Sequence, residues 1–234
     1  MLLLAISWIY ITCVAMGWGK LFSDLINRCL PSEQKHFPDL MMVCLAGISI
    51  TGWLGFSLSI FAPLNGWMHS LICVPAILYL LLSHGNRIFF STVRAYFSAI
   101  SWPGLLLLGT CLLMIAILNA SPVVHPDTLM YHAQSIKWME QYSSVPGLAH
   151  LSNELGMQSL YFANQALFRF QFIHSSDLIF LNGCMAAWFI IFVVANSFKN
   201  KESRQLSKLL PSLLLLAFTL LSWTQLRLTA ASAS

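Results

Sequence analysis

Residues 103–119 read PGLLLLGTCLLMIAILN, a run without a single charged side chain. At about 1.5 Å per residue, this run forms an α-helix about 26 Å long, close to the thickness of a bilayer's hydrocarbon core, about 30 Å. Water is absent there, so backbone N–H and C=O groups must pair within the chain. The run therefore predicts a transmembrane helix.

The whole chain has the composition of a membrane protein. Of its 234 residues, 58% are hydrophobic and 9% charged, against about 25% charged in ordinary soluble domains, and the mean hydropathy is +0.74. The first apolar run lacks the basic start of a signal peptide, so we expect it to stay as a membrane helix. We predict an all-α polytopic protein with about six spans, at residues 1–19, 40–62, 66–83, 103–119, 177–197 and 209–223.

Lysine and arginine predict the orientation. Nine of the twelve lie in three connections, at residues 20–39, 84–102 and 198–208. By the positive-inside rule these connections are cytoplasmic, whereas the long loop 120–176 and the N-terminus face outward. Within 84–102, apolar residues at helical spacing predict a helix lying in the cytoplasmic interface.

The net charge of +4 is explained by basic residues beside anionic lipid headgroups, so the expected partner is the bilayer and not a nucleic acid. Six cysteines are scattered singly without a C-x-x-C spacing. We interpret them as small packing residues, neither a disulfide framework nor a metal site.

The external loop 120–176 is much longer than the other connections, and long ordered loops are often functional. Periodic apolar residues predict one helix over residues 127–142 and a second over 152–170, separated by a turn at 143–147. Exposed aromatic residues suit the membrane interface. We expect both helices to lie along the outer membrane surface.

The part of this loop from Val124 to Gly156, VHPDTLMYHAQSIKWMEQYSSVPGLAHLSNELG, gathers acids, histidines and aromatics. Its order, His-Pro-Asp at 125–127, Tyr-His at 131–132, Trp138, Val-Pro-Gly-Leu-Ala at 145–149 and Leu-Gly at 155–156, resembles bacterial membrane proteins related to the GT-C glycosyltransferases. The resemblance covers residues 103–234. It divides the chain into N-terminal membrane helices, 1–102, and a GT-C-like core, 103–234.

The resemblance implies a function. Asp127 would be the catalytic acidic residue that opens the external loop, accepting a proton from an acceptor hydroxyl while a sugar leaves a polyprenyl phosphate. The acceptor would be an envelope glycan, lipid or protein at the outer face of a bacterial inner membrane. The expected substrate-binding residues are Tyr131, His132, Lys137, Trp138 and Arg227; Arg169 is another cation that could meet the phosphate.

Two features depart from the family pattern. Glu154 precedes Leu155-Gly156, where a basic residue often stands, and several apolar segments precede the loop where simpler relatives have one. The resemblance also predicts that the chain is an N-terminal fragment of a longer protein. No cofactor is indicated: His125, His132, His150 and Glu154 match no strong metal-binding spacing, although some GT-C relatives use a divalent metal.

Alternatives stay open at each point. Asp127 follows Pro126 and could serve only as a helix N-cap, His132 could be structural, and Tyr131 and Trp138 could be interfacial anchors. At the level of function, the alternatives are a non-catalytic membrane subunit or transport component for envelope polysaccharide, and an inactive GT-C relative. Buried ionisable residues would favour transport, and the predicted spans contain almost none.

Overall fold

The computed structural model describes residues 2–29, 31, 39–83, 86–120, 131–145, 147–151, 153–156, 159–170 and 180–198, and within these ranges the regular structure is entirely helical. This confirms the all-α prediction. The elements are α1 (Leu2–Cys29), α2 (Leu40–Ser59), α3 (Gly66–Leu82), α4 (Asn86–Ser98), α5 (Trp102–Ala120), α6 (Ala133–Gln141), α7 (Leu148–Leu151), the 3-10 helix η3 (Asn153–Gly156), α8 (Leu160–Phe168) and α9 (Phe180–Phe198).

Four helices of the described residues are long and apolar enough to cross a membrane: α1, α2, α5 and α9. α3 is apolar but shorter, with 17 residues and Pro75 inside the helix. These helices lie at five of the six predicted positions, and four of them are long and apolar enough to cross a membrane. The sixth, residues 209–223, lies outside the described residues.

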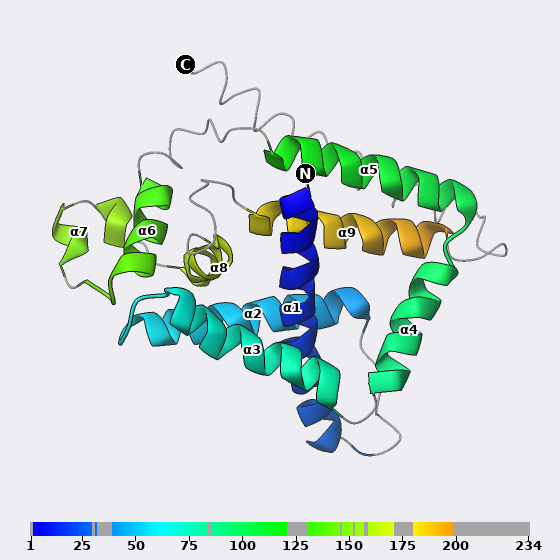
Figure 1. Cartoon of the computed structure of the whole chain (residues 1–234), viewed down its shortest axis with the longest axis horizontal. Helices are drawn as coiled ribbons and strands as arrows, with labels where there is room; N and C mark the ends of the chain where they lie inside the picture. The colour runs from blue at the N-terminus through cyan, green and yellow to red at the C-terminus, as the bar shows by residue number, and fades with distance from the viewer. Residues whose placement is uncertain are drawn as a thin grey trace.

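α1 lies between two pairs of apolar helices, α2 with α3 and α5 with α9. α1 packs against α2, α3 and α9, while α5 packs along α9. In Figure 1, α6, α7 and α8 gather at one end of the spans and α4 lies at the opposite end. The two amphipathic parts of the chain are therefore separated by the length of the spans, as the predicted topology requires.

Glycine permits the closest of these helix contacts. A Cβ added at Gly47 of α2 would collide with the backbone of Ala15, and one added at Gly17 of α1 would collide with the backbone of Ala76 in α3. Small residues let membrane helices approach until their backbones touch, which increases dispersion contact where the hydrophobic effect is weak.

α8 lies deeper than the sequence predicts. Ala163, Leu167 and Phe168 are at most 1% exposed, and they belong to the same buried cluster as Ile11 and Val14 of α1. This burial was not predicted, and the expectation that the second loop helix lies along the membrane surface stays a prediction. Its apolar residues cover nearly the whole helix, so burial against α2 and α9 removes more apolar area from water than an interfacial position would.

The first predicted cytoplasmic connection begins later than expected. α1 continues to Cys29, so Lys20 and Asp24 lie within the helix and not in the loop 20–39. Lys20 is only 2% exposed. The Lys20–Asp24 ion pair at i,i+4 explains this extension, because opposite charges one turn apart stabilise a helix and let the ammonium group be buried.

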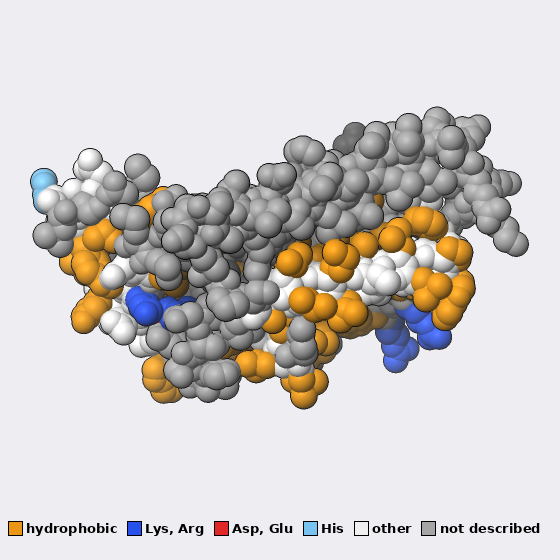
Figure 2. Space-filling view, turned by 90° about the horizontal axis from the view of Figure 1, so that it is seen from above, with side chains coloured by type: hydrophobic (Ala, Val, Ile, Leu, Met, Phe, Trp, Pro, Cys, Tyr) orange, Lys and Arg blue, Asp and Glu red, His pale blue; other side chains and the backbone are white. Residues whose placement is uncertain are grey.

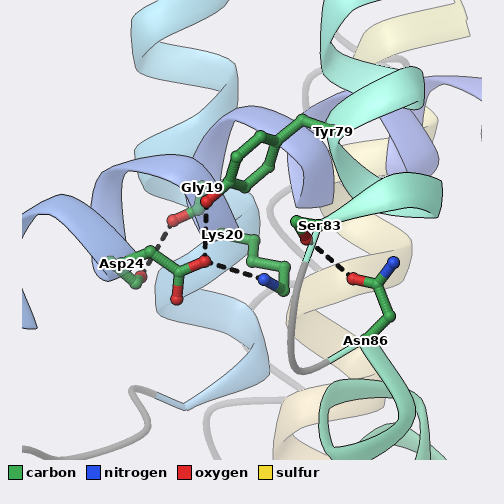
Figure 3. Close-up of polar contacts among 7 residues, drawn as sticks. Gly19, Lys20, Asp24, Tyr79, Ser83 and Asn86 are labelled. Carbon is green, nitrogen blue, oxygen red and sulfur yellow. Dashed lines mark hydrogen bonds and ion pairs between the residues drawn. The ribbon is translucent and has the colours of Figure 1, made fainter.

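Figure 3 shows how the pair is completed by α3. Asp24 Oδ2 accepts hydrogen bonds from Lys20 Nζ at 2.7 Å and from Tyr79 Oη at 2.8 Å. The ammonium group also lies over the Tyr79 ring, 5.2 Å from its centroid. Beyond this network, Ser83 Oγ donates to Asn86 Oδ1 at 2.7 Å and links α3 to α4. This group of contacts fixes α1 and α3 together at the α4 end of the spans.

The prediction of an amphipathic helix within residues 84–102 is confirmed by α4. Phe89 and Tyr96 are buried, whereas Arg87 and Arg94 are exposed. Figure 2 shows one face of the molecule, on which hydrophobic side chains cover much of the described surface and Lys and Arg side chains gather in two small groups. The side of the membrane on which α4 lies stays a prediction.

Candidate functional site

A cavity of about 260 Å³ lies where α6 meets the end of α2. Its walls come from the α2 end and following turn, from one face of α6, and from the segment that contains α7 and η3. The described lining residues are Phe56, Ser59, Ile60, Ser135, Trp138, Met139, Tyr142, Ser143, Ser144, Val145, Gly147, Leu148, Ala149, Leu155 and Gly156. None of these residues is charged at neutral pH.

The helical repeat of α6 explains how one short helix forms a wall. Ser135, Trp138, Met139 and Tyr142 line the cavity, and their spacing of three and four residues places them on one face of a helix. Exposure differs along this face: Ser135 is 1% exposed and Met139 8%, whereas Trp138 is half-buried and Tyr142 is 56% exposed. The hydroxyl group of Ser135 is therefore deep, and Tyr142 lies near the surface.

Backbone hydrogen bonds attach this wall to the spans. Leu64 N–H donates to Met139 O at 2.7 Å, and Ser144 N–H donates to Ser59 O at 2.7 Å. Gly147 follows in a conformation with φ of 89°, which glycine adopts without the strain that a Cβ would bring. The predicted turn at 143–147 is thus held against the end of α2.

The two glycine-containing steps of the family pattern contact each other at the cavity. A Cβ added at Gly156 would lie 2.7 Å from Ala149 Cβ, too close for two carbon atoms. Gly156 therefore lets η3 pack directly on α7. The Val-Pro-Gly-Leu-Ala segment and the Leu-Gly step, separate in sequence, meet beside Trp138 around one cavity.

The second helix of the external loop is shorter than predicted, and the first is described only in part. The structure describes α6 only from Ala133, after a π-helical turn at Tyr131 and His132, and the earlier part of the predicted helix 127–142 lies outside the described residues. The predicted helix 152–170 is wrong as a single element, because η3 ends at Gly156 and α8 begins after Ser159. Ser159 has an extended backbone and its Oγ accepts from Phe162 N–H, which starts a new helix.

The sequence-predicted site residues divide into three groups. Asp127 and Arg227 lie outside the described residues. Trp138 lines the cavity, whereas Lys137, beside it on α6, is half-buried and is not among the lining residues. Tyr131 and His132 contact each other with ring centroids 4.3 Å apart, and they lie at the start of α6.

His132 faces α8, with its ring centroid 5.1 Å from that of Phe162. This contact joins the start of α6 to a buried residue of the neighbouring helix, so His132 has a packing role whether or not it also binds substrate. Among the residues described, no group of three or more His, Cys, Asp or Glu side chains could hold a metal ion. His125 lies outside them.

Arg169 is engaged in an ion pair with Glu140. Its Nη1 lies 3.2 Å from Glu140 Oε2, and both side chains are more than nine-tenths buried. Arg169 is therefore buried against α6, and its contact with a phosphate stays a prediction. The sequence offered Arg169 as a possible phosphate contact, and only the tertiary arrangement shows this engagement.

A polar network between α8 and α9 was not predicted. Tyr161 Oη donates to Asn182 Oδ1, and Gln165 Nε2 donates to Tyr161 Oη at 2.7 Å and to Asn182 Oδ1 at 3.1 Å. Burial raises the pKa of the Tyr161 phenol, and the hydrogen bonds with Gln165 and Asn182 partly oppose that shift. The i,i+4 spacing of Tyr161 and Gln165 was visible in the sequence, but their partner is not local.

The described elements define an all-helical protein with several helices able to cross a membrane, and with a cavity where the segment between α5 and α9 packs on the end of α2. The chain belongs to the DUF8201 family, a domain of unknown function, whose family model matches residues 1–233. Comparisons with curated proteins and with solved structures found no match.

Proposed function

We propose that this protein is a GT-C-like membrane glycosyltransferase, which moves a sugar from a polyprenyl-phosphate donor to an envelope glycan, lipid or protein at the outer face of a bacterial inner membrane. The observation that carries the proposal is the cavity beside Trp138. Around it lie described residues of three separate parts of the family pattern, Trp138, the 145–149 segment and the 155–156 step. Residues that share one cavity can serve one substrate.

In this proposal the reaction is assigned to Asp127. Its carboxylate accepts the proton of the acceptor hydroxyl as that oxygen attacks the anomeric carbon, and the bond from that carbon to the phosphate oxygen breaks. Lys137 and Arg227 are the proposed phosphate contacts, because cations offset the charge of the departing phosphate. Tyr131 and His132 precede Lys137 on the same segment, where they can contact the substrate near the helix start.

The test is the variant Asp127→Asn in the full-length protein, expressed in cells that lack the native gene. We expect the product glycan, followed by mass spectrometry of the envelope fraction, to fall by at least about 100-fold, in line with the typical contribution of general-base catalysis. Asp39→Asn is the matched control: Asp39 Oδ1 caps α2 by accepting from Met41 N–H, and asparagine caps equally well. Unchanged product in Asp127→Asn would refute the catalytic role.

A second candidate is a non-catalytic membrane subunit that binds an envelope glycan. It is favoured by the chemistry of the cavity lining, since none of its described side chains is charged at neutral pH. The same experiment separates the two: a binding subunit keeps its effect on the glycan when Asp127 becomes asparagine, whereas the transferase loses it.

A further inference from the structure

α4 carries two exposed arginines, each followed three residues later by an exposed phenylalanine. Arg87 and Arg94 are exposed, and Phe90 and Phe97 are 44% and 36% exposed. Residues seven apart differ by only about 20° around a helix, and residues three apart are neighbours on its surface. The arginines therefore form one row along α4 and the phenylalanines form a second row beside it. These four residues are called the α4 strip below.

The remaining surface of α4 joins two parts of the fold. Phe89 belongs to a buried cluster with Val43 of α2 and Leu80 of α3. Tyr96, with Ile100 just beyond the helix, belongs to a second buried cluster that contains residues of α5 and α9. Side-chain packing on α4 thus connects α2 and α3 with α5 and α9, and the α4 strip lies on the part of the helix that this packing leaves exposed.

The two arginines of the strip present positive charge to the surroundings. Between Asp39 and Asp127 the sequence contains no aspartate or glutamate, and the ion pairs between described residues, at Lys20 and at Arg169, use other cations. In Figure 2, one of the two groups of Lys and Arg side chains projects from the surface at the end of the molecule where α4 lies in Figure 1. This charge favours an anionic partner.

The phenylalanines and the place of α4 in the chain decide which anion fits. An arginine guanidinium group binds phosphate through two parallel N–H···O bonds, and phenylalanine beside basic residues is typical of helices that lie in the membrane interface. A soluble anion would engage the arginines and leave both phenyl rings in water. An anionic phospholipid engages both rows, because its acyl chains begin beside its phosphate. Short connections join α4 to the apolar helices α3 and α5, which holds the strip close to the headgroups.

We propose that the α4 strip binds the headgroups of anionic phospholipids, and that this binding stabilises the packing of α2 and α3 with α5 and α9. A ligand that binds only the folded chain stabilises it by mass action. Each arginine beside an anionic surface strengthens binding about fivefold, so the pair contributes about 25-fold. The strip and the cavity lie at opposite ends of the spans, so this binding is independent of the proposed function.

Photocrosslinking measures the lipid selectivity at the strip. Ser91 is exposed and lies between the two arginines in sequence, so the variant is Ser91→p-benzoylphenylalanine in the full chain, in nanodiscs of equal phosphatidylcholine and phosphatidylglycerol. Mass spectrometry of the crosslinked α4 peptide should show an excess of phosphatidylglycerol of at least about fivefold. The excess should fall in about 1 M salt, where the Debye length is about 3 Å. Crosslinking to the two lipids in equal amounts would overturn the proposal.

Charge variants in the same crosslinking background locate the binding. Arg87→Gln/Arg94→Gln should remove the excess of phosphatidylglycerol, whereas Arg87→Lys/Arg94→Lys should keep most of it because both positive charges remain. Ala95→Gln is the matched control, since it places a glutamine at an exposed position of α4 and retains both arginines; it should leave the excess unchanged. An undiminished excess in the double glutamine variant contradicts the proposal. The ratio measured with both arginines present decides the question even where that variant fails to fold.

The melting temperature tests the stabilising role. Replacing half of the phosphatidylcholine by phosphatidylglycerol should raise the melting temperature of the wild type by roughly 4 to 8 °C, and that of Arg87→Gln/Arg94→Gln by less than half as much. In phosphatidylcholine alone the two proteins should melt alike. Equal lipid-dependent rises would overturn the stabilising role. Millimolar inorganic phosphate in phosphatidylcholine nanodiscs should give no rise, and a rise equal to that with phosphatidylglycerol would overturn the assignment to a lipid.

Discussion

Arg169 Nη1 lies 3.2 Å from Glu140 Oε2, with 8% and 6% of the two side chains exposed, respectively. This buried ion pair joins the helix that lines the cavity, α6, to the end of α8. α8 in turn packs into the core formed with α1 and α2. The position of the cavity wall therefore depends on a contact between residues that are far apart in the sequence.

Breaking this ion pair should destabilise the protein strongly. In Arg169→Met, the Glu140 carboxylate stays buried without its ion-pair partner, which typically costs about 3 to 5 kcal/mol. We expect a clear fall in melting temperature in phosphatidylcholine nanodiscs, measured by circular dichroism. The double variant Glu140→Gln/Arg169→Met should recover part of the loss, and Arg94→Met, at an exposed position on α4, should change little. Equal melting temperatures for Arg169→Met and Arg94→Met would contradict the structure.

Close packing of α1 on α2 predicts a contrast between two glycines. Gly47→Ala forces its Cβ into the backbone of Ala15, and overpacking of this kind costs about 1 to 3 kcal/mol or more. A Cβ at Gly109 meets none of the described residues within 4 Å, so Gly109→Ala should raise stability by about 0.5 to 1 kcal/mol through helix propensity. Unfolding in denaturant measures the free energy of unfolding of each variant. The structure is contradicted if the two variants change stability in the same direction.

Alkaline pH should destabilise the fold through Tyr96. Burial, with a smaller contribution from the negative charge of Asp39, raises the pKa of Tyr96 to about 12, whereas a tyrosine in the unfolded chain titrates near about 10. The contribution of the Tyr96 phenol to the free energy of unfolding is complete below about pH 10. It is lost as the pH rises from about 10 to about 12, because in that range only the unfolded chain releases the phenol proton.

The measurement is the melting temperature of wild type and Tyr96→Phe between pH 9 and pH 12. The phenylalanine variant should lose less stability across the window, and the exposed control Tyr142→Phe should follow wild type. Parallel curves for Tyr96→Phe and wild type would argue against a buried phenol at this position.

The helix start at Ser159 gives a local prediction. Its Oγ accepts from Phe162 N–H at 3.2 Å, so Ser159→Ala should cost about 1 kcal/mol and increase amide hydrogen exchange in the first turn of α8. Ser159→Asp keeps an acceptor at the cap and should retain the protection. If aspartate loses as much protection as alanine, the cap does not form as described.

The sequence predicted the helical class and most span positions because these depend on local properties. The charge-free run at 103–119 lies within α5, and the runs at 40–62 and 66–83 match α2 and α3 to within a few residues. In lipid, backbone N–H and C=O groups must form hydrogen bonds within the chain, and an α-helix does this between residues that are close in sequence. Element ends were less accurate: α1 extends to Cys29, and although the Lys20–Asp24 pair at i,i+4 is visible in the sequence, its further partner Tyr79 comes from α3.

The candidate site was only partly accessible from the sequence. Trp138 and the segments at 145–149 and 155–156 were singled out by resemblance, and the structure places their described residues around one cavity. Asp127 and Arg227 lie outside the described residues, so their roles stay predictions. The phenol–amide network of Tyr161, Gln165 and Asn182 went unrecognised, since its third member comes from α9.

By itself, the sequence predicted that the described residues are helical and include helices long and apolar enough to cross a membrane, because hydrophobicity and helix length act residue by residue along the chain. The tertiary structure alone decided that α8 is buried against α1 and α2, that Arg169 pairs with Glu140, and that the hydroxyl group of Ser135 is buried. These features depend on which distant side chains share a space. Hydrogen bonding, charge pairing and burial act between such neighbours, and only the packed fold brings those neighbours together.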